Sequence, residues 1–211
     1  MNRPAQPPRV WQRMLSGRRL DLADPSPFDV EISDIAHGLA RVARWNGQTH
    51  GAHAFSVAQH CVLVVEVALR RNGEMSAADR LATLLHDAPE YVIGDMISPF
   101  KALVGGSYKA VEARLLAAIH LRFGLPAERS APLVRAIKAA DRIAAYHEAT
   151  RLAGFATNEA AAFFGLPRGV PADGLPLDPW PTAEAQARFL ELYNALADSL
   201  AAESAEKNNA R

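Results

Sequence analysis

The chain has 211 residues, which is enough for one substantial hydrophobic core, and nothing in its composition demands two domains. Lysine plus arginine equals aspartate plus glutamate at 23 each, so no overall positive field favours a nucleic-acid polymer or a membrane surface. No apolar run approaches the length of a membrane span, about 18 residues, and the N-terminus lacks the apolar core of a signal peptide. The single cysteine, Cys61, excludes an internal disulfide framework. These features predict a soluble cytoplasmic protein.

Hydrophobic periodicity predicts an all-α protein in which little reads as strand. Residues 1–32 are rich in proline and arginine and are expected to form an extended N-terminal arm. Apolar residues at three- and four-residue steps predict helices, which in chain order cover 33–45, 56–73, 76–92, 107–124, 131–154, 158–165 and 182–202. Residues 203–211 should form a flexible tail. The expected architecture is a single compact domain at 33–202 with six or seven main helices.

Local capping signals set the expected ends of several helices. Ser33 and Ser76 are plausible N-caps, and Ser56 with Gln59 has the spacing of a capping box. Pro89 falls inside the predicted helix at 76–92, where proline removes a backbone donor and clashes with the preceding turn. We therefore expect this helix to be kinked or broken into two pieces.

Four ionisable residues interrupt the apolar faces of three of these helices: His60, His86, Asp87 and Asp141. Each costs free energy to bury unless it is paired or ligated. A divalent cation would be a common partner for all four, because it neutralises two carboxylates and accepts two neutral imidazoles.

The order of these residues resembles that of the HD-domain metal-dependent phosphohydrolases. The matching segments are "SVAQH", "LLHDAPE", with its acid three residues beyond the His-Asp pair, and "IKAADRIAA". An Arg-Trp pair at 44–45 and "GDMISPFK" at 94–101 look like the bacterial 5′-deoxynucleotidase branch, and the resemblance covers roughly residues 33–151. It implies an HD-type helical bundle that hydrolyses deoxynucleoside 5′-monophosphates to deoxynucleoside and phosphate.

The resemblance also implies a metal site and its acid–base groups. The ligands of one divalent metal would be His60, His86, Asp87 and Asp141. A mixed nitrogen and oxygen set suits manganese, cobalt, nickel, iron or zinc better than magnesium or calcium. Glu90 would orient the attacking water or shuttle a proton, and Asp95 would lie near the scissile bond or hold a pocket residue.

The same resemblance implies the residues that bind the nucleotide substrate. Arg44 offers a planar, permanently charged fork for phosphate, and Trp45 offers a flat face for a sugar or base. Lys101 would add a point charge on the phosphate. His53 is the nearer of two loop histidines to His60 and is the weakest of these candidates.

Three questions stay open at this stage. Glu148 lies seven residues after Asp141 on the same side of its helix, so it either supports the metal site or is exposed. The apolar face of 182–202 serves either a symmetric homodimer or the protein's own core. The reaction has alternatives too: a nucleoside triphosphate or guanosine alarmone hydrolase, or a nucleotide-binding regulator without catalysis. The presence of both Glu90 and Asp95 argues against such a regulator.

Overall fold

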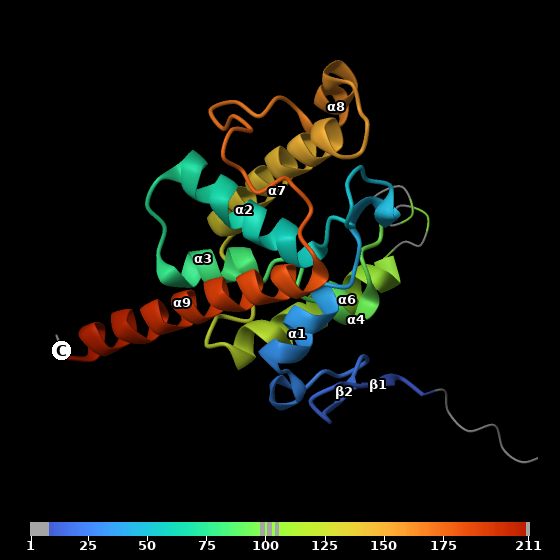
Figure 1. The fold of residues 1–211 in the computed structure, drawn as a ribbon. Coiled ribbons are helices and arrows are strands. Elements are labelled where there is room, and N and C mark those ends of the chain that lie inside the picture. The colour runs from blue at the N-terminus through green and yellow to red at the C-terminus, as the bar shows by residue number, and fades with distance from the viewer. Residues whose placement is uncertain (1–8, 98–99, 101–102, 104–105, 210–211) are drawn as a thin grey trace, which may run out of the picture.

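The computed structural model describes residues 9–97, 100, 103 and 106–209 (Figure 1). In chain order its α-helices are α1 (Ile32–Leu39), α2 (Val57–Asn72), α3 (Ala77–Leu84), α4 (Glu90–Ile93), α6 (Gly106–Arg122), α7 (Ala131–Arg151), α8 (Thr157–Phe164) and α9 (Thr182–Asn209). Helix α2 contacts α7 on one side and α3 and α9 on the other, so much of its surface is buried. The prediction of an all-α bundle is confirmed. No helix in the described part of the chain is both long enough and apolar enough to cross a bilayer.

The predicted serine N-caps of α2 and α3 are confirmed, whereas the Gln59 half of the capping box is absent because its side chain bonds to residues 176–180. The Ser56 hydroxyl accepts a hydrogen bond from the backbone N–H of Gln59, and the Ser76 hydroxyl does the same for Asp79. The expected break at Pro89 is present, since α3 ends at Leu84 and α4 begins only after the proline. The His-Asp pair therefore lies in a turn between two short helices rather than on a continuous helix.

The predicted helix at 33–45 is wrong at both ends. Helix α1 begins at Ile32 without a side-chain cap and ends at Leu39. The residues Arg44–Gly47 form a separate 3-10 turn, η2, in which Trp45 and Asn46 have φ of 58° and 51°. A right-handed helix cannot continue through two consecutive residues with left-handed backbone angles. Helical periodicity alone did not reveal this turn.

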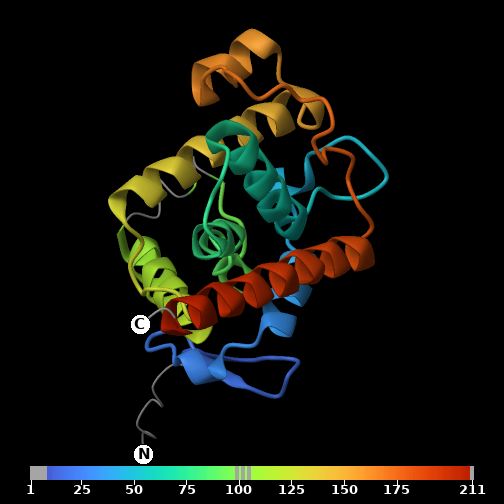
Figure 2. The same ribbon diagram turned by 90° about the vertical axis from the view of Figure 1, so that its left-hand side faces the viewer.

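The N-terminal arm contains a β-hairpin that periodicity did not predict. Strand β1 (Trp11–Arg13) pairs antiparallel with β2 (Arg19–Asp21), and the hairpin lies at the end of the molecule opposite α8 (Figures 1 and 2). Strands of three residues are too short to show a clear alternation of apolar and polar residues. The side chain of Leu20 is fully buried, and the carboxylate of Asp34 on α1 accepts hydrogen bonds from the backbone N–H and hydroxyl of Ser16. The arm is therefore packed against the helical domain.

The apolar face of 182–202 lies on helix α9 and packs against the rest of the chain. Ala185, Phe189 and Leu196 are buried in the same core as α1, α2 and α3, so this face is covered within the chain. The helix also continues past residue 202 to Asn209. Glu203 accepts a hydrogen bond from the backbone N–H of Ala77 and so anchors this extension to the start of α3.

A buried amide connects α2 to the loop that precedes α9. The side chain of Gln59 donates to the carbonyls of Pro176 and Asp178, at 3.0 and 2.7 Å, and accepts from the backbone N–H of Trp180 at 2.9 Å. Only an amide offers both donors and an acceptor, so a carboxylate could not replace these bonds. Gln59 directly precedes His60 in the first turn of α2, so these three hydrogen bonds hold that turn in place.

Candidate metal centre

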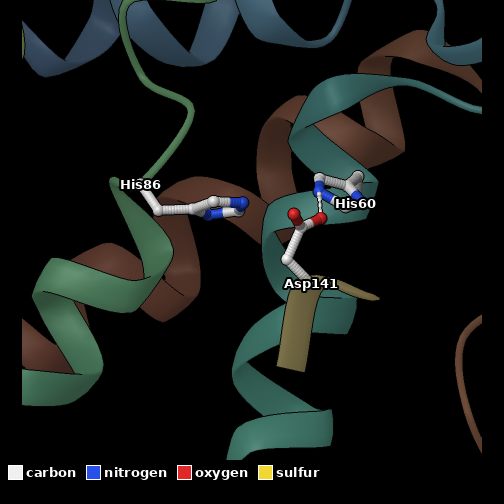
Figure 3. Close-up of side chains that lie close together, drawn as sticks. All are labelled: His60, His86 and Asp141. Carbon is white, nitrogen blue, oxygen red and sulfur yellow. Dashed lines mark ion pairs between the residues drawn. The ribbon is translucent and has the colours of Figure 1, made fainter. Parts of the chain in front are cut away.

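Three separate segments bring the predicted ligands together. His60 lies in the first turn of α2, His86 and Asp87 lie in the turn between α3 and α4, and Asp141 lies in the middle of α7. Figure 3 shows the His86 ring pointing toward the pair formed by His60 and Asp141. One ligand atom from each of His60, His86 and Asp141 lies within 4.8 Å of the other two. These three residues could hold a metal ion.

Asp87 completes the cluster. Its Oδ2 lies 3.4 Å from Nε2 of His60 and 3.2 Å from Nε2 of His86, while Oδ1 of Asp141 lies 3.3 Å from Nε2 of His60. The side chains of His60 and His86 are 0% and 6% exposed, whereas that of Asp141 is 38% exposed. The cluster is therefore buried on its imidazole side and open to solvent at Asp141.

Each imidazole is oriented by a hydrogen bond on its other nitrogen. Nδ1 of His60 lies 2.6 Å from Oε1 of Glu148, and Nδ1 of His86 lies 2.9 Å from the carbonyl oxygen of Thr83. The two Nε2 atoms are buried, and although carboxylate oxygens lie 3.2–3.4 Å away, neither atom makes a hydrogen bond of acceptable geometry among the described residues. Leaving such atoms unsatisfied costs about 1–3 kcal/mol each. A metal ion that accepts both lone pairs would remove this cost, so the residues present fit a metal.

The electrostatics of the cluster attract positive charge. Burial alone would lower the pKa of His86, but the Asp87 carboxylate outweighs burial and raises this pKa to about 10. Burial and Arg44 would both lower the pKa of His60, yet Glu148 and the neighbouring aspartates raise it well above its usual range. Burial would raise the pKa of Asp87, but the two imidazoles hold it well below its usual range. A divalent cation would replace the protons that these imidazoles otherwise bind.

Glu148 is buried, which answers one question that the sequence left open. Its Oε2 accepts from Nε and Nη2 of Arg44, both at 3.2 Å, and from the indole Nε1 of Trp45 at 2.9 Å. Burial would raise the pKa of this carboxyl group, but Arg44 and His60 outweigh burial and lower the pKa to about 2. The sequence signal was available, because Glu148 lies two helical turns after Asp141 on the same side of α7.

The predicted substrate residues Arg44 and Trp45 are therefore also part of the support for His60. Nη1 of Arg44 lies 3.8 Å from Asp95 and 4.0 Å from Asp87, so this end of the guanidinium reaches the ligand cluster. The Trp45 ring packs against Phe155 and Phe164, with ring centroids 5.6 and 5.9 Å apart. Phe164 lies in α8 and Phe155 lies just before it, and neither contact with Trp45 was expected from the sequence.

Replacing Arg44 by alanine should destabilise the fold. The Arg44 side chain is 13% exposed and that of Glu148 is 0% exposed, so the substitution leaves a buried carboxylate without its main cation. We expect the free energy of unfolding to fall by about 3 kcal/mol, near the low end for breaking a buried ion pair, because His60 and Trp45 still bond to Glu148. Urea denaturation followed by circular dichroism measures this change. Arg135→Ala, at an exposed position of α7, is the control, and equal stability of the two variants would contradict the prediction.

Glu90 and Asp95, the predicted acid–base residues, are buried rather than surface acids. Glu90 is 1% exposed and the Asp95 side chain is 8% exposed. Burial raises the pKa of the Cys61 thiol, and the carboxylates of Asp87 and Glu90 add to this shift. Asp95 lies beside Arg44, with its Oδ2 3.8 Å from Nη1 of the guanidinium.

The remaining substrate candidates are His53 and Lys101. His53 is exposed in the loop before α2, and among the described residues no hydrogen bond or ion pair joins it to the cluster. Lys101 lies outside the described residues. A further cation, Arg129, was not recognised from the sequence. Burial lowers the pKa of Arg129, and attraction to Asp87 and Glu112 opposes this shift.

The chain is similar along most of its length to two proteins whose functions are not described. It is 56% identical over 192 residues to an uncharacterized protein of Rhodobacter capsulatus, covering 91% of this chain and 98% of that protein. It is 31% identical over 190 residues to the uncharacterized protein YfdR of Escherichia coli, covering 88% of this chain and 95% of YfdR. No protein-family model matches the chain. The extent and level of these similarities show that the chain belongs to the same family as YfdR and the Rhodobacter capsulatus protein.

Proposed function

We propose that this protein is a metal-dependent phosphohydrolase of the HD-domain type that hydrolyses deoxynucleoside 5′-monophosphates to deoxynucleosides and phosphate. One observation carries the proposal. The Nε2 atoms of His60 and His86 and the carboxylates of Asp87 and Asp141 come from three segments and lie 3.2–3.4 Å from one another in the pairs His60–Asp87, His60–Asp141 and His86–Asp87, with the Asp141 side chain 38% exposed. The sequence resemblance supplies the reaction class that such a site would serve.

The chain's own residues would divide the work of the reaction. When bound, a divalent metal such as manganese, cobalt, nickel, iron or zinc would polarise the phosphoryl group and lower the pKa of a water molecule. Arg44 would bind the phosphate through Nη1, the end of its guanidinium that does not bond to Glu148. Asp95 would keep Arg44 in place, and Glu90 would accept a proton from the attacking water.

One observation favours the alternative of a longer phosphate chain. A nucleoside triphosphate or a guanosine alarmone would need more cations near the site than Arg44 and Lys101 supply. Arg129 is such a cation, since its guanidinium is attracted by Asp87.

A panel of substrates distinguishes hydrolysis of deoxynucleoside monophosphates from hydrolysis of a triphosphate or an alarmone. The protein would be loaded with manganese or cobalt and incubated with deoxynucleoside monophosphates, ribonucleoside monophosphates, nucleoside triphosphates and guanosine tetraphosphate. We expect orthophosphate release from the deoxynucleoside monophosphates. Turnover restricted to triphosphates or to guanosine tetraphosphate would replace this proposal with the alternative. Nucleotide binding without turnover under any metal would indicate a regulator instead of an enzyme.

A further inference from the structure

The carboxylate of Glu148 connects three residues behind the candidate metal site. It is fully buried, and its four hydrogen bonds come from Nδ1 of His60, from Nε and Nη2 of Arg44 and from Nε1 of Trp45. The candidate ligand atom of His60 is Nε2, on the other side of the imidazole ring. Glu148 therefore contacts the ring at Nδ1, the nitrogen that is not the candidate metal ligand.

We infer that Glu148 is a positioning residue, held by Arg44 and Trp45, that keeps the His60 ring with its proton on Nδ1 and its lone pair on Nε2. A ligating imidazole must present an unprotonated nitrogen, and the hydrogen bond on its other nitrogen decides which one this is. The inference rests on the proposed metal site. It assigns Trp45 the role of holding Glu148 through the indole N–H. It does not depend on which nucleotide is hydrolysed.

The groups around Glu148 require a carboxylate rather than an amide. The guanidinium of Arg44 and the indole of Trp45 can only donate, and Nδ1 of His60 must donate if Nε2 is to bind a metal. Glutamine would offer one accepting oxygen and one donating NH2 group. If the oxygen turned toward Arg44 and Trp45, where three donors meet it, the NH2 group would face His60. His60 would then accept at Nδ1 and carry its proton on Nε2, where it blocks metal binding.

A strained turn holds the two supporting side chains in place. Trp45 and Asn46 both have left-handed backbone angles, which cost roughly 1–2 kcal/mol for each residue that is not glycine. The Trp45 indole offsets part of this cost by bonding to Glu148 and packing against Phe155 and Phe164. The turn delivers Arg44 and Trp45 to the same carboxylate, which explains why the strained conformation persists.

Cobalt binding to three variants tests the inference. Glu148→Gln changes the hydrogen-bonding pattern without changing size, Trp45→Phe removes one donor and keeps an aromatic ring, and Phe163→Ala is the control. Phe163 is 66% exposed and contacts the same aromatic cluster without reaching Glu148. We expect the cobalt affinity of Glu148→Gln to be roughly 10- to 100-fold lower than that of the native protein, which is the range for residues that orient metal ligands. Trp45→Phe should show a smaller loss, and Phe163→Ala none.

Nitrogen-15 spectra of labelled histidine separate positioning from general support of the fold. Neutral His60 should carry its proton on Nε2 in Glu148→Gln, whereas the zinc-loaded native protein should carry it on Nδ1. Glu148→Gln with native cobalt affinity and an Nδ1 proton would overturn the inference and leave the proposed hydrolysis untouched. A native protein that binds cobalt but hydrolyses no nucleotide would overturn the proposed function and leave this inference standing. If circular dichroism shows that Glu148→Gln is unfolded, native cobalt affinity in Trp45→Phe would overturn the inference.

Discussion

Replacing Asp141 by alanine is expected to abolish stoichiometric binding of a divalent metal. Asp141 is the member of the cluster that α7 contributes, and its Oδ1 lies 3.3 Å from Nε2 of His60. Its loss removes a negatively charged oxygen donor and leaves the open side of the site without a ligand. The Asp141 side chain is 38% exposed, so its truncation creates no enclosed cavity and the fold should persist.

Metal content measured by mass spectrometry after loading and desalting tests this prediction. Asp198→Ala is a matched control, because it removes an exposed carboxylate from α9. The control should retain one metal per chain under conditions in which Asp141→Ala retains none. Stoichiometric metal in Asp141→Ala would show that Asp141 is not a ligand.

Replacing Glu90 by glutamine is expected to lower phosphatase activity by roughly two to four orders of magnitude, the range for a positioned acid–base group. The side chain is only 1% exposed, so glutamine is a better replacement than alanine, which would leave a cavity at the start of α4. Because Glu90 is not one of the proposed ligands, metal content should stay native. The measurements are phosphate release at saturating substrate and metal per chain.

Asp95→Asn provides the comparison for this variant. Asp95 lies beside Nη1 of Arg44, so its substitution should mainly weaken phosphate binding and raise KM. Native kcat in Glu90→Gln would move the proton-transfer role from Glu90 to Asp95. Loss of metal from Glu90→Gln would instead place Glu90 among the ligands.

The sequence by itself determined the features that depend on neighbouring residues. The caps at Ser56 and Ser76 and the break before α4 follow from hydrogen bonds and steric contacts that span four residues or fewer. The helical periodicity was likewise sufficient for the all-α class. The candidate ligands could be named because ionisable residues inside apolar helices need a common partner. The structure brings His60, His86 and Asp141 together as that argument requires.

Only the tertiary structure decided which groups surround these residues. His60 and its partner Glu148 are 88 residues apart, and Arg44 and Glu148 are 104 residues apart, so no local pattern connects them. The left-handed turn at Trp45 is costly by itself and is compensated by contacts with α7 and with Phe164 of α8. The end of α1 and the burial of Glu148 therefore depend on contacts that form only when distant segments pack. Short-range preferences decide where α2 and α3 begin, but the free energy of a buried charge depends on every group that surrounds it, and that environment exists only in the folded chain.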